Sequence, residues 1–254
     1  MKRWLRHRRS RPTLSPREQA DTWQIVSLLL GYPEPRLLAL LPTLAEVATS
    51  LPDRVAGPLN DFLEHARRCE PAELQTQYVD TFDVTRKCCL HLTYFLHGDT
   101  RNRGAALVQF KQAYRKAGVV LHDERAELPD HLCVVLEFGA TVDADAAWTL
   151  LNHHRVGIEL LHQGLLRRSS PWIDVVRALR ATLPDLDEDD NLALARLIAE
   201  GPPHEDVGID NAPYALDPAL DQLRTPPGSD GCGTPTGAQE PTFLGSTIDV
   251  GVPR

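Results

Sequence analysis

Between Ser15 and Ala199 the apolar side chains recur every three to four residues, and proline repeatedly stands where such a run begins. This spacing places apolar side chains on one face of an α-helix, and proline is well tolerated in the first helical turn. No segment shows a convincing strand-like alternation of apolar and polar residues. We therefore predict an all-α fold, a single-domain helical bundle of about eight to ten helices.

The ends of the apolar runs give the expected helix boundaries, because Ser, Asp and Pro favour helix starts and Gly favours helix ends. The run KCCLHLTYFLH is apolar nearly all round, which predicts a helix buried at the centre of the bundle. The longest single helix is expected at 143–168. The full set of expected helices covers residues 16–30, 35–51, 53–69, 71–82, 86–97, 101–116, 129–140, 143–168, 171–183 and 190–199.

Composition divides the chain into three parts. Residues 1–14 form a basic arm that we expect to be disordered, and residues 15–200 form the helical domain. Residues 201–254 hold nine of the 20 prolines and eight of the 16 glycines. This acidic Pro/Gly-rich tail is expected to be largely flexible, because its composition does not support a packed core.

The balance of charge and hydropathy excludes several classes of protein. A net charge of -8 argues against nucleic acid as the main partner, because phosphate binding needs a basic face. No apolar run reaches the ~20 residues of a membrane span, and the basic start lacks the apolar stretch of a secretory signal. Five irregularly spaced cysteines suit a reducing compartment. We expect a cytoplasmic protein with no stable membrane insertion.

The segment FLHGDTRNRG concentrates polar side chains between two apolar runs, and it contains His97, Arg101 and Arg103. Two interpretations stay open. The arginines could pair with Asp80, Asp83 or Glu137 and tie helices together, or one of them could face solvent or a ligand.

The segment LPDHL offers a second polar cluster. Pro129 is expected to begin a helix, which places Asp130 in the first turn near the positive end of the helix dipole. His131 would then be exposed at that end. The pair is either an ordinary helix start with a surface histidine or part of the polar rim of a groove.

Enzyme signatures are absent from the sequence. It contains no GxSxG elbow, no Walker A segment and no GxGxxG after a strand. Cys88 and His91 would share a helix face, but a buried free cysteine is commonly just a small apolar residue, so we predict no metal or other cofactor. Two alternatives remain: a small helical enzyme using Asp130 and His131 as acid and base, and a scaffold or regulator that acts through the basic arm.

Four segments together resemble one family. YVDTFD, FLHGDTRNRG and AELPDHLCVVLEF follow in that order, preceded by LLLGYPEPRL. They are similar to the NarJ family of nitrate reductase molybdenum cofactor assembly chaperones, relatives of the TorD and DmsD chaperones. The resemblance covers about residues 22–200.

The resemblance implies a TorD-like helical chaperone without catalytic activity. Such a protein binds the apo form of the catalytic (alpha) subunit of respiratory nitrate reductase, mainly through the N-terminal segment of that subunit. It acts before molybdenum cofactor insertion and membrane docking. Proteins that deliver the cofactor are candidate partners as well.

A helical client peptide needs an apolar groove with a polar rim. We expect Tyr78 and Phe82 to form the floor of that groove. The expected peptide-binding residues are Tyr78, Phe82, His97, Arg101, Arg103, Asp130, His131 and Glu137.

Overall fold

A computed structural model of the chain describes residues 12–98, 100–120 and 127–200. Residues 1–11 of the basic arm and the Pro/Gly-rich tail at 201–254 lie outside the described residues. Within the described part the protein is all-helical, as predicted, and its only β-type pairing is an isolated antiparallel bridge between His91 and His131. None of the described helices is both long and apolar enough to cross a membrane.

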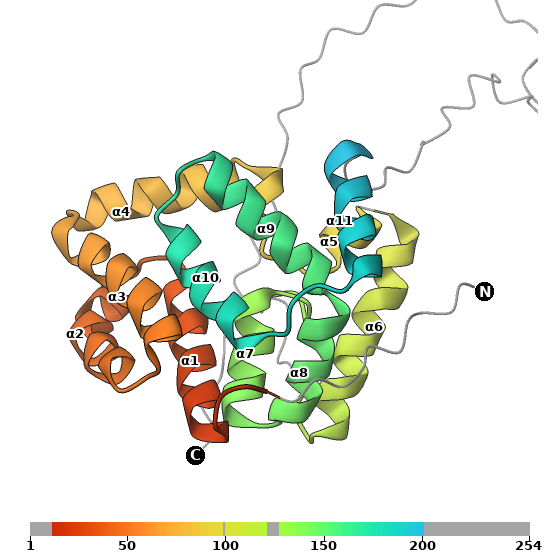
Figure 1. The fold of residues 1–254 in the computed structure, drawn as a ribbon, viewed down its shortest axis with the longest axis horizontal. Coiled ribbons are helices and arrows are strands. Elements are labelled where there is room, and N and C mark those ends of the chain that lie inside the picture. Colours follow the sequence, from red (N-terminus) through yellow and green to blue (C-terminus); the bar gives the residue numbers. More distant parts are fainter. Residues whose placement is uncertain (1–11, 99, 121–126, 201–254) are drawn as a thin grey trace, which may run out of the picture. The chain divides into compact units, whose positions relative to one another are not determined.

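Eleven α-helices form the body of the molecule (Figure 1). They are α1 (Pro16–Leu29), α2 (Pro35–Thr49), α3 (Asp53–Arg68), α4 (Pro71–Tyr78), α5 (Tyr94–His97), α6 (Arg101–Lys116), α7 (Leu132–Thr141), α8 (Ala144–His153), α9 (Arg155–Arg167), α10 (Trp172–Thr182) and α11 (Glu188–Glu200). A π-helical turn (Val79–Asp83) follows α4, and a 3-10 turn (Arg86–Cys88) comes before α5.

Helix α1 begins at the predicted Ser15 cap, which the structure shows as a full capping box. The Ser15 hydroxyl accepts the backbone N–H of Glu18, and the Glu18 carboxylate accepts the backbone N–H of Ser15. This arrangement satisfies amides that have no partner inside the helix. Leu14 is buried against the core, so the packed body begins slightly before the predicted boundary at residue 15.

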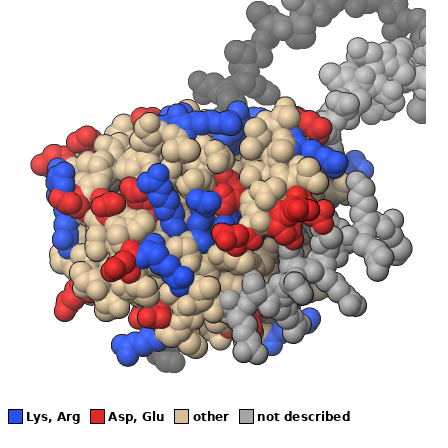
Figure 2. All heavy atoms as spheres, viewed as in Figure 1, with Lys and Arg blue, Asp and Glu red and all other residues tan. Residues whose placement is uncertain are grey.

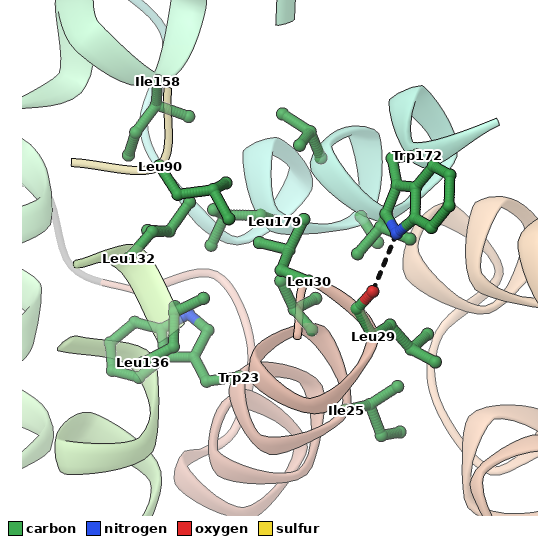
Figure 3. Packing of buried hydrophobic residues seen from close by; sticks show 14 of the residues in the cluster. Trp23, Ile25, Leu29, Leu30, Leu90, Leu132, Leu136, Ile158, Trp172 and Leu179 are labelled. Atoms are coloured by element: carbon green, nitrogen blue, oxygen red, sulfur yellow. Dashed lines mark hydrogen bonds between the residues drawn. The ribbon is translucent and has the colours of Figure 1, made fainter. Parts of the chain in front are cut away.

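Helix α1 lies at the centre of the core, against α7 and α10. The indole N–H of Trp172 donates to the Leu29 carbonyl at the end of α1, at 2.9 Å (Figure 3). The indole N–H of Trp23 donates to the Thr182 hydroxyl at the end of α10, at 3.1 Å. Each indole thus combines a large buried apolar surface with a satisfied donor that joins two helices.

Glycine allows α7 to lie very close to its neighbours. A Cβ atom at Gly139 would stand 2.5 Å from the Ala147 Cβ and 2.6 Å from the Trp23 ring. No side chain fits there, so Gly139 fixes the approach of α1, α7 and α8.

Three predicted helices were wrong in detail. Residues 86–97 do not form one buried helix, because residues 86–88 form a 3-10 turn, only the last four residues are α-helical, and the residues between these two parts are not helical. Pro129 does not begin a helix, since α7 starts at Leu132. The long helix at 143–168 is divided at His154, which leaves the helical backbone region and whose ring nitrogen Nδ1 bonds to the Leu150 carbonyl at 2.9 Å.

The surface shown in Figure 2 mixes the two signs of charge. Basic and acidic side chains are interspersed there among uncharged residues. That face carries no broad basic field of the kind that binds nucleic acid.

Candidate functional site

The polar segment LPDHL meets the apolar run that precedes α5, where residues 90–94 cross residues 128–132. The backbone N–H of Leu92 donates to the Asp130 carbonyl at 3.0 Å, and that of Leu132 donates to the Leu90 carbonyl at 2.9 Å. These bonds form the antiparallel bridge between His91 and His131. They also explain why the chain is not helical just before α5, because the Leu92 amide pairs across the chain instead of along a helix.

Asp130 lies at the centre of this crossing with no exposed surface. Its carboxylate accepts the backbone N–H of Thr93 at 3.1 Å and the Thr93 hydroxyl at 2.5 Å. His91 Nδ1 lies 3.3 Å from one carboxylate oxygen, and Arg103 Nη2 lies 3.8 Å from the other. A carboxylate oxygen only accepts, so His91 carries a proton on Nδ1. Buried charge needs such partners to be tolerated.

These contacts decide the protonation of the cluster. Burial on its own would raise the pKa of Asp130, but the hydrogen bonds from His91 and Thr93 lower that pKa to about 2. Burial lowers the pKa of His131 to about 4. At neutral pH Asp130 is therefore an anion and His131 is neutral. Asp130 is also out of reach of a substrate, so the pair is unsuited to general acid and base catalysis.

Arg103 connects the buried acid to the surface of α5. Its Nε donates to the Thr93 hydroxyl at 3.2 Å, and its guanidinium carbon lies 6.0 Å from the centre of the Tyr94 ring. The expectation that an arginine of this segment pairs internally is therefore met at Arg103, with Asp130 as a partner that the sequence analysis did not consider. Arg101 is exposed at the start of α6.

Tyr94 also lines a groove of about 390 Å³. This groove lies between α5, α9, the 3-10 turn and the end of α11. Its lining is mainly apolar, and three basic side chains belong to it. The lining residues are Arg86, Lys87, Tyr94, Phe95, Leu160, Gln163, Gly164, Arg167, Leu197, Ile198, Ala199 and Glu200. We call this the α5–α9 groove.

Two glycines of α9 shape the groove. A Cβ atom at Gly164 would lie 2.5 Å from the Lys87 carbonyl oxygen, and one at Gly157 would lie 3.3 Å from the Leu92 carbonyl oxygen. Without side chains at these positions, residues 87–95 pack directly on α9. The basic 3-10 turn and the aromatic residues of α5 are thereby held beside the α9 surface.

The structure brings only some of the expected site residues together. Asp130, His131 and Arg103 meet at the crossing, but Asp130 is buried, so its assignment to an exposed rim was wrong. His131 is half-buried, with its ring edge-on to His91 at 5.1 Å between centroids, and is not the exposed histidine that we expected. His97 is half-buried at the end of α5, and Glu137 is exposed on α7.

Tyr78 and Phe82 do not form the floor of the α5–α9 groove. The Tyr78 hydroxyl donates to the Leu30 carbonyl at 3.1 Å, and its ring packs on Phe82 and Trp172. Tyr78 is therefore a core residue, and the i, i+4 spacing that placed it beside Phe82 indicates core packing.

Sequence reasoning missed the residues that make the groove. Tyr94 and Phe95 lie in the run that was interpreted as a buried helix, and Leu160 lies within the long helix expected at 143–168. The one available signal was the pair of glycines seven residues apart in α9, which would cost helix stability unless another segment packs there.

Comparison with known proteins adds evidence of a different kind. The family model described as "Nitrate reductase delta subunit" matches residues 48–178, which is more than half of the chain. The chain belongs to the nitrate reductase delta subunit family. This confirms the resemblance that the three central segments indicated.

Relatives of this family member carry informative names. The nitrate reductase molybdenum cofactor assembly chaperone NarJ of Escherichia coli K12 is 32% identical over 216 residues, covering 82% of this chain and 86% of that protein. The Bacillus subtilis protein named "Probable nitrate reductase molybdenum cofactor assembly chaperone NarJ" is 30% identical over 65% of this chain and 89% of that protein.

A third relative is much longer. The nitrate reductase-like protein NarX of Mycobacterium tuberculosis H37Rv is 41% identical over 160 residues, or 63% of this chain. The match spans 24% of NarX, about a quarter of its length.

Proposed function

We propose that this protein is an assembly chaperone for the catalytic subunit of nitrate reductase. It binds the apo form of that subunit in the cytoplasm, mainly through the N-terminal segment of the subunit, and acts before molybdenum cofactor insertion and membrane docking. Support comes from the family and from relatives named as assembly chaperones rather than as enzymes. Among the described residues, no group of three or more His, Cys, Asp or Glu side chains is placed to hold a metal ion.

The observation that carries this proposal is the α5–α9 groove. At about 390 Å³ it lies within the roughly 300–1,000 Å³ range of protein binding pockets. Tyr94, Phe95 and Leu160 provide apolar surface for the anchors of an amphipathic helix, which is the usual requirement of helix-in-groove recognition.

The charged side chains of the α5–α9 groove also suit a peptide ligand. Arg86 and Lys87 enter the groove from the 3-10 turn and Arg167 from the end of α9. These cations favour a segment with carboxylates beside its apolar anchors, and electrostatic attraction of this kind speeds association. A groove open to solvent also suits a chaperone, because the client must leave once it is complete.

The Asp130 cluster helps to hold Tyr94, one of the residues that line the groove. Asp130 holds Thr93 and Arg103, and Arg103 lies against the Tyr94 ring. In this proposal the polar segments resembling the NarJ family position the aromatic residues of α5, and α5 contacts the client.

Leu160→Glu tests the groove, because it puts a charge on an apolar lining position that is half-buried. We expect the full chain carrying Leu160→Glu to bind a synthetic peptide from the N-terminus of the catalytic subunit about tenfold more weakly than the wild type. Isothermal titration calorimetry measures the dissociation constants.

Leu166→Glu provides the matched control on the same helix. Leu166 is 47% exposed and does not line the groove, so this variant should bind like the wild type. Equal affinity for Leu160→Glu and Leu166→Glu would exclude the α5–α9 groove as the binding site. A wild-type chain that binds no catalytic-subunit peptide would contradict the proposed function itself.

A further inference from the structure

Helix α11 differs from the other described α-helices in how little of it is buried. Each of the ten preceding α-helices contains buried residues, whereas α11 contains none. Its main packing partner is α9, and Figure 1 shows it beside α9 and α5. Since apolar burial is the chief source of helix docking energy, α11 belongs to the least stable part of the described fold.

The packed body is complete before α11 begins. Leu183 is buried, and the Pro184 carbonyl accepts the side-chain Nε–H of Arg155 at 3.1 Å. Arg155 is itself buried and pairs with Glu159 at 2.6 Å. The chain is thus anchored up to Pro184, and residues 185–187 connect that anchor to α11. Detachment of α11 would leave this anchor intact.

The same helix lines the α5–α9 groove. Leu197, Ile198 and Glu200 all belong to the groove lining. The half-buried side of α11 carries Ala193, Leu194 and Leu197, at the i, i+1, i+4 spacing of an amphipathic helix. One wall of the groove is therefore an amphipathic helix that contributes no buried side chain to the body.

We propose that α11 occupies part of the client site and is displaced when the client binds. The occupant that replaces it is an acidic amphipathic helix, with aliphatic side chains three or four residues apart and carboxylates near the basic rim. This inference rests on the proposed function, and it adds that the chaperone's own helix competes with the client.

The chemistry of α11 supports this choice of occupant. Leu194 and Leu197 lie three residues apart, and Glu200 lines a groove that also contains Arg86, Lys87 and Arg167. The α9 surface therefore already accepts an aliphatic helix that carries a carboxylate. A client helix with more apolar surface would bury more area at the same site and would therefore displace α11.

Competition predicts that loosening α11 improves client binding. The double substitution Leu194→Asp with Leu197→Asp, in the full chain, places charges on the half-buried side of α11. We expect it to bind the catalytic-subunit N-terminal peptide on the order of fivefold more tightly than the wild type, because the peptide no longer has to displace α11. The thermal unfolding midpoint of the body should stay unchanged.

Leu192→Asp is the matched control, because Leu192 is on the same helix but 60% exposed, and it should leave peptide affinity unchanged. Hydrogen exchange gives a second readout, in which the amides of 188–200 of the wild type exchange faster once peptide is bound. Unchanged or weaker binding by the double variant, slower exchange in α11, or a lower unfolding midpoint would each overturn the displacement of α11. None of those three results would argue against peptide binding as such.

Discussion

Asp130→Ala lowers the free energy of unfolding by about 3–5 kcal/mol, the loss expected when one partner of a buried ion pair is removed. The variant leaves the backbone N–H of Thr93 without its acceptor and removes the contact of Arg103 with the Asp130 carboxylate. It also releases His91 from the crossing. Urea denaturation followed by circular dichroism measures the change.

Asp83→Ala serves as the control, since Asp83 is an exposed carboxylate and its loss should change stability little. Equal losses for the two variants would show that the Asp130 network does not hold the fold.

Acid titration gives a further test of the Asp130 network, because the direction of its pH dependence is defined. The folded-state pKa of Asp130 is lowered to about 2, so its contribution is complete above an unfolded pKa near 3.8 and is lost as pH falls from there towards 2. Asp130→Asn should remove this part of the acid dependence.

Trp172→Ala produces a loss of similar size, about 3–5 kcal/mol, through lost packing. Trp172 is almost fully buried, and its ring contacts Phe62, Tyr78 and Phe82 at centroid distances of 5.3–5.6 Å. Its indole N–H also satisfies the Leu29 carbonyl, the hydrogen bond drawn in Figure 3. Chemical denaturation gives the free energy of unfolding.

Two further variants separate packing from the hydrogen bond. Trp172→Phe keeps much of the ring volume but removes the donor, so it should lose less than Trp172→Ala and still about 1–3 kcal/mol. Trp148→Ala removes a half-buried tryptophan that stacks on Trp23 at 6.5 Å, and it should cost less than Trp172→Ala. A Trp172→Ala variant as stable as the wild type would contradict the central place given to the contact of α1 with α10.

The first helices could be predicted closely because their ends are set by local chemistry. Ser15 caps α1, and Pro35 begins α2 at the predicted position. Such signals depend on neighbours in the sequence and need no knowledge of the fold. The helical class followed from the same periodicity, and the structure confirms it for the described residues.

The prediction failed where distant segments compete with local preference. The run before α5 has helical apolar content, yet Thr93 gives its backbone N–H to Asp130, 37 residues away. Asp130 was expected in the first turn of a helix, because the sequence could not show that Thr93, His91 and Arg103 surround it. The division of 143–168 at His154 was also missed, since its apolar pattern continues across the break.

The candidate site was only partly predictable for the same reason. Arg103, Asp130 and His131 were among the eight residues expected to bind the client, but their contacts depend on the crossing of two segments. The α5–α9 groove combines Tyr94, Leu160 and Ile198, which are separated by up to a hundred residues of sequence and carry no shared motif. The sequence shows which residue types are present, but only the three-dimensional structure shows that these residues lie close together.

Capture of the catalytic subunit tests the central claim most directly. An affinity-tagged full chain is produced with the nitrate reductase catalytic subunit in two kinds of cells, one able and one unable to make the molybdenum cofactor. We predict that the chain co-purifies with the cofactor-free subunit, that Leu160→Glu reduces the captured amount, and that the cofactor-loaded subunit is not retained. Failure to capture the cofactor-free subunit, or equal capture of both forms, would contradict the account.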